Sequence, residues 1–176
     1  MALFDFLKPD KTVKVQQPVS FYNLACKTID GEPFNFSSLK GKKVMIVNVA
    51  SKCGFTPQYE DLEKLYKEYS NMDFVILGFP SNDFLKQESG TEKEIKEFCQ
   101  LTYGVSFPMM SKVKVRGKEM HPVYKWLTQR SLNGSADSKV RWNFQKYLIS
   151  KEGNIENVIS SREKPFSSKI LDFIKE

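Results

Sequence analysis

The hydrophobic positions of the chain include two short, nearly continuous apolar runs. The run VMIVNVA, residues 44–50, is rich in β-branched residues, and DFVILGF, residues 73–79, repeats the pattern. Such runs are typical of central strands that are covered on both faces. They predict two strands in the interior of a sheet.

Segments with apolar residues at helical spacing predict four helices. The first follows Thr56 and Pro57, which suit an N-cap and a first helical position, and the second starts near Thr91, which forms a capping box with Glu94. A third spans residues 122–130, and the last begins at Pro165. The expected inward-facing residues are Tyr59, Leu62, Leu65, Tyr66 and Tyr69; Ile95, Phe98, Cys99 and Thr102; and Phe166, Ile170, Phe173 and Ile174.

The remaining apolar segments predict strands. Residues 21–43 contain two short strands around the turn at Asp30-Gly31, FPMMSKVKV at 107–115 suggests another, and KEGN joins the runs 144–150 and 155–161. Strands that alternate with helices, then a hairpin and a final helix, predict an α/β fold: a three-layer sandwich with a mixed central sheet and an N-terminal β-hairpin. This order of elements is thioredoxin-like.

Length and charge limit the classes of function. The 176 residues suit one domain, which we place at residues 18–176 after an N-terminal extension at 1–17. The formal net charge is +6, but 27 basic residues are interleaved with 21 acidic ones, which is typical of a solvated surface and gives no support for nucleic-acid binding. A mild bias towards an acidic protein partner or an anionic substrate is the alternative interpretation.

The N-terminus lacks the apolar core of a signal peptide, and no later stretch is long and apolar enough for a membrane span. The three cysteines, an odd number at wide spacing, favour a reducing cytoplasm over a secreted disulfide framework. No metal-ligand cluster and no phosphate-binding glycine motif are present, so we expect no metal and no cofactor. The single histidine, His121, precedes Pro122 and suits a helix start.

Cys53 lies in the turn between the first buried run and the first helix. The N–H groups of a helix N-terminus and the neighbouring Lys52 would favour a reactive thiolate there. A small buried thiol is the competing interpretation, and position alone leaves the two open. The sequence has no CxxC motif, which argues against a dithiol oxidoreductase.

Three segments in order, NVASKCGFTPQY (48–59), LGFPSNDF (77–84) and RWNFQKYLI (141–149), resemble the signature segments of the glutathione peroxidases that use cysteine in place of selenocysteine. The similarity runs from about Pro18 to the C-terminus. It implies a thioredoxin-like fold and a thiol peroxidase that reduces hydrogen peroxide and organic or lipid hydroperoxides.

The resemblance also implies roles for single residues. Cys53 matches the peroxidatic residue, and Trp142 and Asn143 match the hydrogen-bond donors beside it. Asp83 occupies the position of the family's catalytic glutamine, and an ionised carboxylate there would raise the pKa of Cys53. Asp83 can therefore point away from the sulfur, be protonated, or leave the donor role to Asn82 or Gln87.

The resemblance further suggests how the enzyme is reduced. Ser81 replaces a cysteine of the second segment, so Cys99 is the candidate resolving thiol, whereas Cys26 is expected to be structural. A Cys53–Cys99 disulfide would make thioredoxin the preferred reductant over glutathione. The short segment 131–141 resembles the monomeric members, whose open site admits bulky substrates.

Two other functions are compatible with the same residues. A peroxide sensor or redox relay would use Cys53 to pass oxidation to a partner protein. A non-catalytic binding module of thioredoxin-like fold is the other, which Asp83 would allow.

Overall fold

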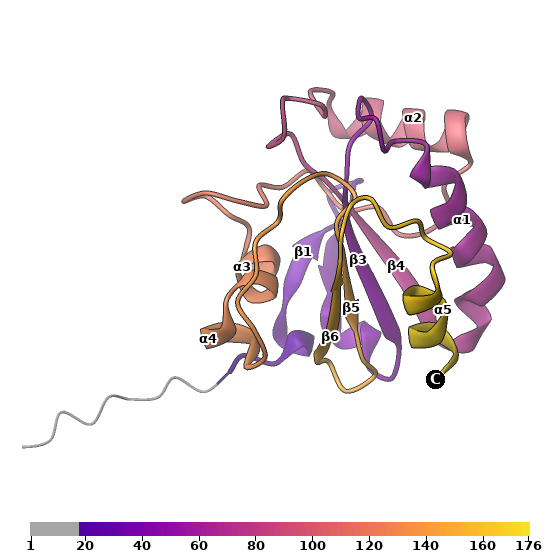
Figure 1. The fold of residues 1–176 in the computed structure, drawn as a ribbon. Helices are drawn as coiled ribbons and strands as arrows, with labels where there is room; N and C mark the ends of the chain where they lie inside the picture. The colour runs from indigo at the N-terminus through magenta and orange to yellow at the C-terminus, as the bar shows by residue number, and fades with distance from the viewer. Residues whose placement is uncertain (1–17) are drawn as a thin grey trace, which may run out of the picture.

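The structure is a computed structural model that describes residues 18–176, so the predicted extension at residues 1–17 lies outside the described residues. Figure 1 shows a central sheet with helices on both sides. The main sheet contains β3 (Lys43–Val49), β4 (Phe74–Pro80), β5 (Lys146–Ile149) and β6 (Ile155–Ile159). Its strand order is β4-β3-β5-β6.

The sheet is mixed, as predicted. Strands β3 and β4 are parallel and are connected through helix α1 (Gln58–Tyr69), whereas β5 pairs antiparallel with both β3 and β6. All residues of β3 and β4 are buried, which agrees with their continuous apolar sequence.

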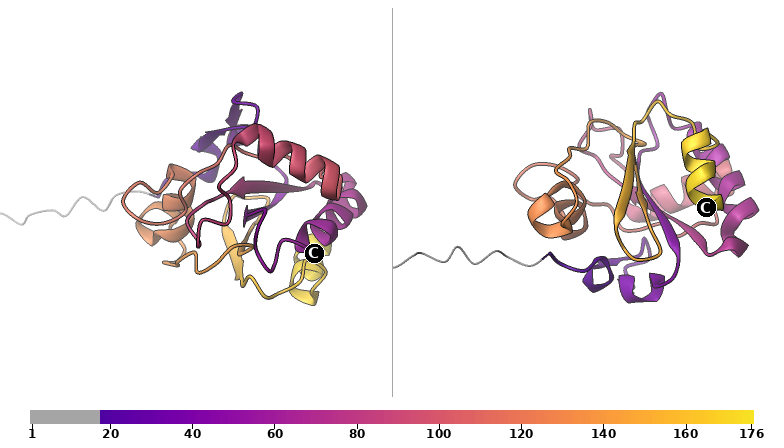
Figure 2. Two further views of the ribbon diagram at one scale, coloured as in Figure 1. Left: turned by 90° about the horizontal axis from the view of Figure 1, so that it is seen from above. Right: turned by 60° about the horizontal axis from the view of Figure 1, so that its bottom comes forward.

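Alternate residues of the central strands face two separate cores. Met45 and Val47 pack with helices α1, α2 (Glu92–Tyr103) and α5 (Ser168–Lys175). Val44 and Ile46 pack on the opposite face, with α3 (Pro122–Thr128) and the N-terminal hairpin. Figures 1 and 2 show α5 beside α1, across the sheet from α3 and α4 (Arg130–Asn133). The three-layer α/β prediction is therefore confirmed.

The N-terminal hairpin is also as predicted. Strands β1 (Ala25–Lys27) and β2 (Pro33–Asn35) pair antiparallel around Gly31, which has a positive φ of 82°. Short 3-10 turns flank the hairpin and follow α1, at Phe21–Asn23, Phe36–Leu39 and Ser70–Met72.

Besides the start of α1, which is described with the site, four details of the element predictions are wrong. The segment 107–115 forms no regular strand: Met110 bridges Thr28, and Met109 bridges Gly78 beside β4. Helix α3 ends at Thr128 because Gln129 is extended, and α5 starts at Ser168 because turns occupy the residues around Pro165. The fourth is Thr102, which is exposed on α2.

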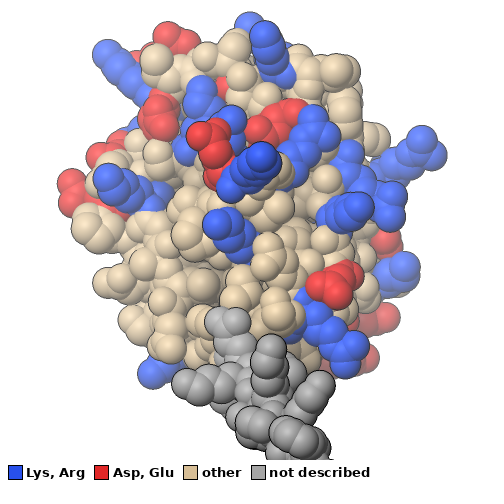
Figure 3. Space-filling view, turned by 90° about the vertical axis from the view of Figure 1, so that its left-hand side faces the viewer, with Lys and Arg blue, Asp and Glu red and all other residues tan. Residues whose placement is uncertain are grey.

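No helix within residues 18–176 is long and apolar enough to cross a membrane. Figure 3 shows basic and acidic side chains intermingled on the face that carries α3 and α4, in line with the predicted mixed surface.

Candidate active site

Thr56 organises the loop that carries Cys53. Its hydroxyl donates to the Ala50 carbonyl oxygen at 2.8 Å and accepts from the Cys53 N–H at 2.9 Å. The Thr56 N–H in turn donates to the Cys53 carbonyl oxygen at 3.0 Å. Thr56 is therefore not the N-cap that the sequence suggested: α1 begins at Gln58, and the threonine side chain closes the preceding turn instead.

The Cys53 side chain is half-buried and packs against the core that contains α1 and α2. Its Sγ accepts a hydrogen bond from the Phe55 N–H at 3.3 Å. A backbone donor at the sulfur stabilises the thiolate more than the thiol. The hydrogen-bond donor at the sulfur thus comes from the loop before α1, not from the first turn of the helix.

The stretch that follows the second signature segment contacts this loop through Gln87. The Gln87 carbonyl oxygen accepts from the Lys52 N–H at 3.1 Å, and its side-chain Oε1 accepts from Asn143 Nδ2 at 2.9 Å. Gln87 therefore joins the Cys53 loop to the third segment. Leu85 and Lys86, just before it, both have left-handed backbone conformations, with φ of 51° and 53°.

Asp83 is directed elsewhere. Its Oδ2 accepts from the Val115 N–H at 2.7 Å and from the Arg116 N–H at 3.3 Å, and the Arg116 guanidinium donates to its backbone oxygen at 2.5 Å. The same guanidinium lies over the Phe84 ring, 4.5 Å from its centroid. These contacts direct the carboxylate towards residues 115–116.

The third segment is positioned by Asn48, a polar residue near the C-terminal end of β3. Asn48 Nδ2 donates to the Trp142 carbonyl oxygen at 3.0 Å, and its backbone oxygen accepts from the Phe144 N–H at 2.6 Å. Asn143 is fully buried, and its Oδ1 has no hydrogen-bond partner among the described residues. Within residues 18–176 the Asn143 side chain thus makes one hydrogen bond, to Gln87.

Trp142 is half-buried, and its ring packs against Phe84 at 5.3 Å between centroids. It also lines a surface cavity of about 480 Å³ together with Phe55, Arg141 and Arg162. Since Phe55 is the residue whose N–H reaches the Cys53 sulfur, this cavity lies beside the cysteine loop.

Lys146 ties these loops to the sheet. Its fully buried ammonium donates to Gln58 Oε1 at 2.7 Å and to the carbonyl oxygens of Phe144 and Glu163 at 2.7 and 2.9 Å. Burial lowers the pKa of Lys146 to about 7. The residue connects β5 with the start of α1 and with the segment before α5.

Comparison with known proteins identifies the family. Residues 21–128 match the family model described as glutathione peroxidase. The chain belongs to the glutathione peroxidase family. It is 52% identical, over 148 residues, to glutathione peroxidase-like peroxiredoxin 2 of Saccharomyces cerevisiae, and the match covers 84% of this chain and 91% of the relative. The prediction of a cysteine-type glutathione peroxidase is confirmed.

Solved structures support the same assignment. The crystal structure of Trgpx in apo form has a TM-score of 0.70 and 35% identity, covering 91% of this chain and 98% of that one. A thiol:disulfide interchange protein of the thioredoxin family from Chlorobium tepidum TLS has a TM-score of 0.62 at 22% identity, covering 90% and 97% of the two chains, and supports the fold alone. The thioredoxin-like fold is confirmed.

The other two cysteines of this glutathione peroxidase lie in the core, and all three are free thiols. Cys99 is 1% exposed on α2, and burial raises its pKa to about 11. Cys26 lies in β1 with its Sγ 3.5 Å from the Met110 sulfur, and burial raises its pKa to about 12. In this arrangement only Cys53 has both a donor at its sulfur and partial access to solvent.

His121 has the structural place that the sequence suggested, because its Nδ1 accepts from the Val123 N–H at 3.1 Å as the N-cap of α3. Within residues 18–176 no group of three or more His, Cys, Asp or Glu side chains is arranged to hold a metal ion.

Proposed function

We propose that Cys53 is the peroxidatic residue of this thiol peroxidase. Its thiolate attacks one oxygen of a hydroperoxide, a sulfur–oxygen bond forms, and the oxygen–oxygen bond breaks. The departing oxygen takes a proton and leaves as water or an alcohol, while Cys53 becomes a sulfenic acid. The substrates are hydrogen peroxide and organic or lipid hydroperoxides.

The observation that carries this proposal is the hydrogen bond from the Phe55 N–H to the Cys53 sulfur. It holds the nucleophile in a loop that Thr56 fixes from both sides, so the donor is in place before substrate arrives. Neither Cys26 nor Cys99 has such an environment.

We assign the remaining donors to the neighbouring loops. Trp142 lines the cavity beside Phe55, and Asn143 is oriented by its bond to Gln87. Gln87 takes the linking role that Asp83 cannot take while its carboxylate is bound to Val115. Asp83 accordingly has no part in the proposed reaction.

Resolution requires a second sulfur, and we propose Cys99. Its thiol displaces water from the sulfenic acid and forms a disulfide with Cys53, and a thioredoxin returns both sulfurs to thiols with two electrons and two protons. Since Cys99 is buried on α2, part of this helix must open for the sulfurs to come within disulfide distance. We further propose a monomer in the reducing cytoplasm, where three free thiols persist.

The test is peroxide turnover with thioredoxin, thioredoxin reductase and NADPH, with glutathione as the alternative donor. We expect turnover with thioredoxin in the wild type, none in Cys53→Ser, and a loss of at least about 100-fold in Cys99→Ser. Mass spectrometry after one equivalent of peroxide should find a Cys53–Cys99 disulfide in the wild type and a sulfenic or sulfinic acid on Cys53 in Cys99→Ser.

Cys26→Ser is the matched control, because it removes a thiol outside the reaction and should keep turnover. Turnover by Cys53→Ser would disprove the assignment of the nucleophile. Full thioredoxin-dependent turnover in Cys99→Ser would show that Cys99 is not the resolving residue. No feature of the structure favours the relay function over the peroxidase.

A further inference from the structure

Glu88 carries a buried carboxyl group with one oxygen unpaired among the described residues. The residue is 1% exposed, its Oε2 has no hydrogen-bond partner among the described residues, and it takes part in no ion pair within that part of the chain. An ionised carboxylate is rarely buried without compensation, because desolvation penalises its charge. Burial accordingly raises the pKa of Glu88 to about 7, with the Ser51 hydroxyl and the charges of Lys112 and Lys52 acting in the opposite direction.

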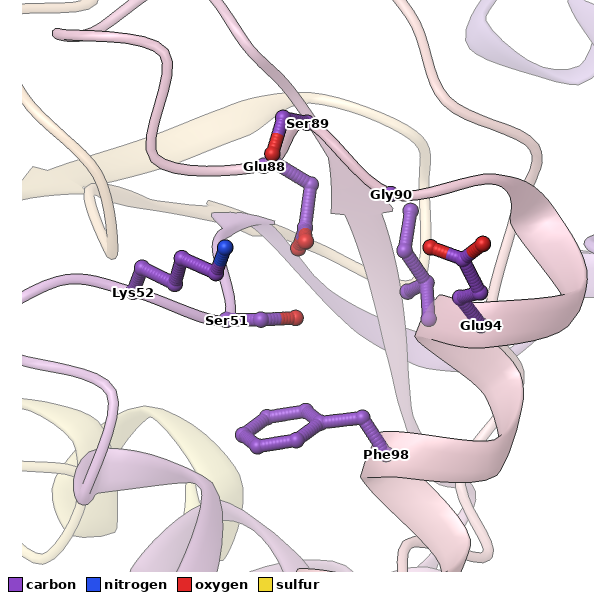
Figure 4. A pocket seen from close by; sticks show the side chains of 8 residues that line it. Ser51, Lys52, Glu88, Ser89, Gly90, Glu94 and Phe98 are labelled. Carbon is purple, nitrogen blue, oxygen red and sulfur yellow. The ribbon is translucent and has the colours of Figure 1, made fainter.

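This carboxyl lies between the two segments that carry the reacting sulfurs. It lines a cavity of about 230 Å³ whose other walls include Ser51 and Lys52, directly before Cys53, and Ile95 and Phe98 of α2. Figure 4 shows the Glu88 carboxyl pointing into this space, with Lys52 and Ser51 on one side and the helix on the other.

The backbone of Glu88 is anchored independently of α2. Its N–H donates to Asn82 Oδ1 at 3.0 Å, and its carbonyl oxygen accepts from Lys112 Nζ at 3.2 Å. The preceding residue, Gln87, accepts from the Lys52 N–H. None of these contacts involves α2, so Glu88 would keep its place beside the Cys53 loop if α2 opened.

The charged and titratable groups that face Glu88 come from four segments: Lys52 in the loop after β3, Lys112 in the segment after α2, Glu94 and Cys99 on α2, and Tyr59 on α1. The Glu88 charge raises the pKa of Cys99, in addition to the larger effect of burial. The carboxylate and the thiol are therefore close enough to affect each other's ionisation even in the closed helix.

The resolving step needs a group that moves a proton. The Cys99 thiol must lose its proton to attack, and the hydroxyl of the Cys53 sulfenic acid must gain one to leave as water. A buried Cys99 does not ionise by itself near neutral pH, since its pKa is about 11. A carboxyl group that titrates near the working pH is suited to both transfers.

We propose that the Glu88 carboxylate takes the thiol proton of Cys99 as its sulfur attacks the Cys53 sulfenic acid, and gives that proton to the departing hydroxyl. The sulfur–sulfur bond forms, the sulfur–oxygen bond breaks, one water leaves, and Glu88 ends in its starting ionisation state. The inference rests on the proposed function, in which Cys99 is the resolving residue. Glu88 is then a proton-transfer residue of the second step and has no direct part in the first.

The experiment measures the two steps separately in single turnover, by rapid quench and mass spectrometry, from about pH 5.5 to 8.5. In the wild type we expect the rate of disulfide formation to rise with pH around a midpoint near 7, as Glu88 loses its proton. In Glu88→Gln this transition should disappear, with the rate near pH 7 lowered by about 100-fold. Glu88→Asp should keep the transition and recover part of the rate.

Glu94→Gln is the matched control, because Glu94 lines the same cavity but is exposed and lies on α2. It should keep both the rate and the pH transition. A role of Glu88 in packing alone would change the rate equally at every pH and leave the transition in place, and that result would overturn the inference. So would a Glu88→Gln profile identical to the wild type.

Failure of the proposed function gives a different result. In that case Cys53 of the wild type would form no sulfenic acid, or Cys99→Ser would resolve as fast as the wild type. If both sulfurs react as proposed and Glu88→Gln leaves the rate and pH dependence of disulfide formation unchanged, only the inference about Glu88 is disproved.

Discussion

At the scale of single residues, the Asp83 carboxylate is hydrogen-bonded to the backbone of residues 115–116. Two N–H groups bind its Oδ2, and the Arg116 guanidinium lies beside the same turn. Backbone N–H groups that donate to a carboxylate take the place of the water molecules that would otherwise solvate its charge. Its negative charge is thereby compensated by the N–H groups of residues 115–116.

We therefore predict that Asp83→Gln changes the rate of Cys53 oxidation by hydrogen peroxide by less than about threefold, while the free energy of unfolding falls by about 1 to 2 kcal/mol through the lost hydrogen bonds. Stopped-flow kinetics and urea unfolding measure the two effects. Asp137→Gln is the control, since Asp137 also accepts a backbone N–H, from Arg130 at 2.8 Å, in another loop. A strong acceleration in Asp83→Gln alone would mean that the carboxylate faces the sulfur.

The sequence could suggest Cys53, Trp142 and Asn143, because each lies within a recognisable local motif. It could not assign the supporting contacts, because their partners are distant in the chain. Gln87 meets Asn143 across 56 residues, and Asn48 meets Trp142 across 94. The polar Asn48 in an apolar run was the one local signal, since a buried amide needs partners.

At the scale of elements, α2 is held by a buried apolar stripe, and the proposed resolving step requires this helix to open. Ile95 and Cys99 are buried in its apolar stripe, and the Thr91 side chain caps its first turn by accepting from the Glu94 N–H at 3.3 Å. The same packing that stabilises the helix keeps Cys99 from Cys53. The stability of α2 should therefore limit disulfide formation.

Thr91→Ala removes the cap, which typically stabilises a helix by about 1 kcal/mol. If opening of α2 precedes disulfide formation in a rapid equilibrium, we expect that step to become about fivefold faster. The rate of sulfenic acid formation should stay the same. Single-turnover kinetics separate the two steps.

Thr102→Ala is the contrasting variant, since Thr102 is exposed within the same helix and alanine favours helix formation. It should slow disulfide formation slightly. Equal rates in Thr91→Ala, Thr102→Ala and the wild type would show that opening of the first turn does not limit resolution.

Element boundaries were predictable where local chemistry decides them, as at Thr91. They were less predictable where contacts with other parts of the fold replace the local hydrogen bonds that would set the boundary. Thr56 has the sequence of an N-cap, yet its hydroxyl bonds to Ala50 and Cys53, and the helix begins later. Met109 and Met110 have the sequence of a strand, but each makes only one bridge, because Pro108 before them lacks an N–H for a longer ladder.

At the scale of the whole molecule, the sheet and its two cores follow from the apolar sequence of β3 and β4. Continuous burial on both faces requires a layer on each side, so the three-layer arrangement was predictable. The buried charges were not predictable, because nothing in the local sequence, FQKYLI around Lys146 or LKQESG around Glu88, indicates that the charged side chain is enclosed. Tertiary structure alone buries them.

Glu88 should also affect global stability as a function of pH. Its pKa is raised from 4.5 to about 7 in the folded protein, so the folded state keeps a proton that the unfolded chain releases from about pH 4.5 upward. The free energy of unfolding should therefore decrease between about pH 4.5 and 7, by about 2 to 3 kcal/mol in total. Glu88→Gln should remove this decrease.

Urea unfolding at about pH 5 and pH 8 measures this effect, and the difference between the wild type and Glu88→Gln isolates it from other groups. Glu94→Gln, which changes an exposed carboxylate, should follow the wild type. A wild type and a Glu88→Gln variant that lose stability in parallel over this range would contradict a raised pKa at Glu88.

The burial of Cys26 and Cys99 has a consequence for survival in the presence of the substrate. Both are enclosed as thiols with strongly raised pKa values, and Met45, Met109 and Met110 are also buried. An oxidant that arrives from solvent meets Cys53 before any other cysteine. If Cys53 reacts as proposed, selectivity for this one sulfur depends on the shielding of the other two as much as on the surroundings of Cys53.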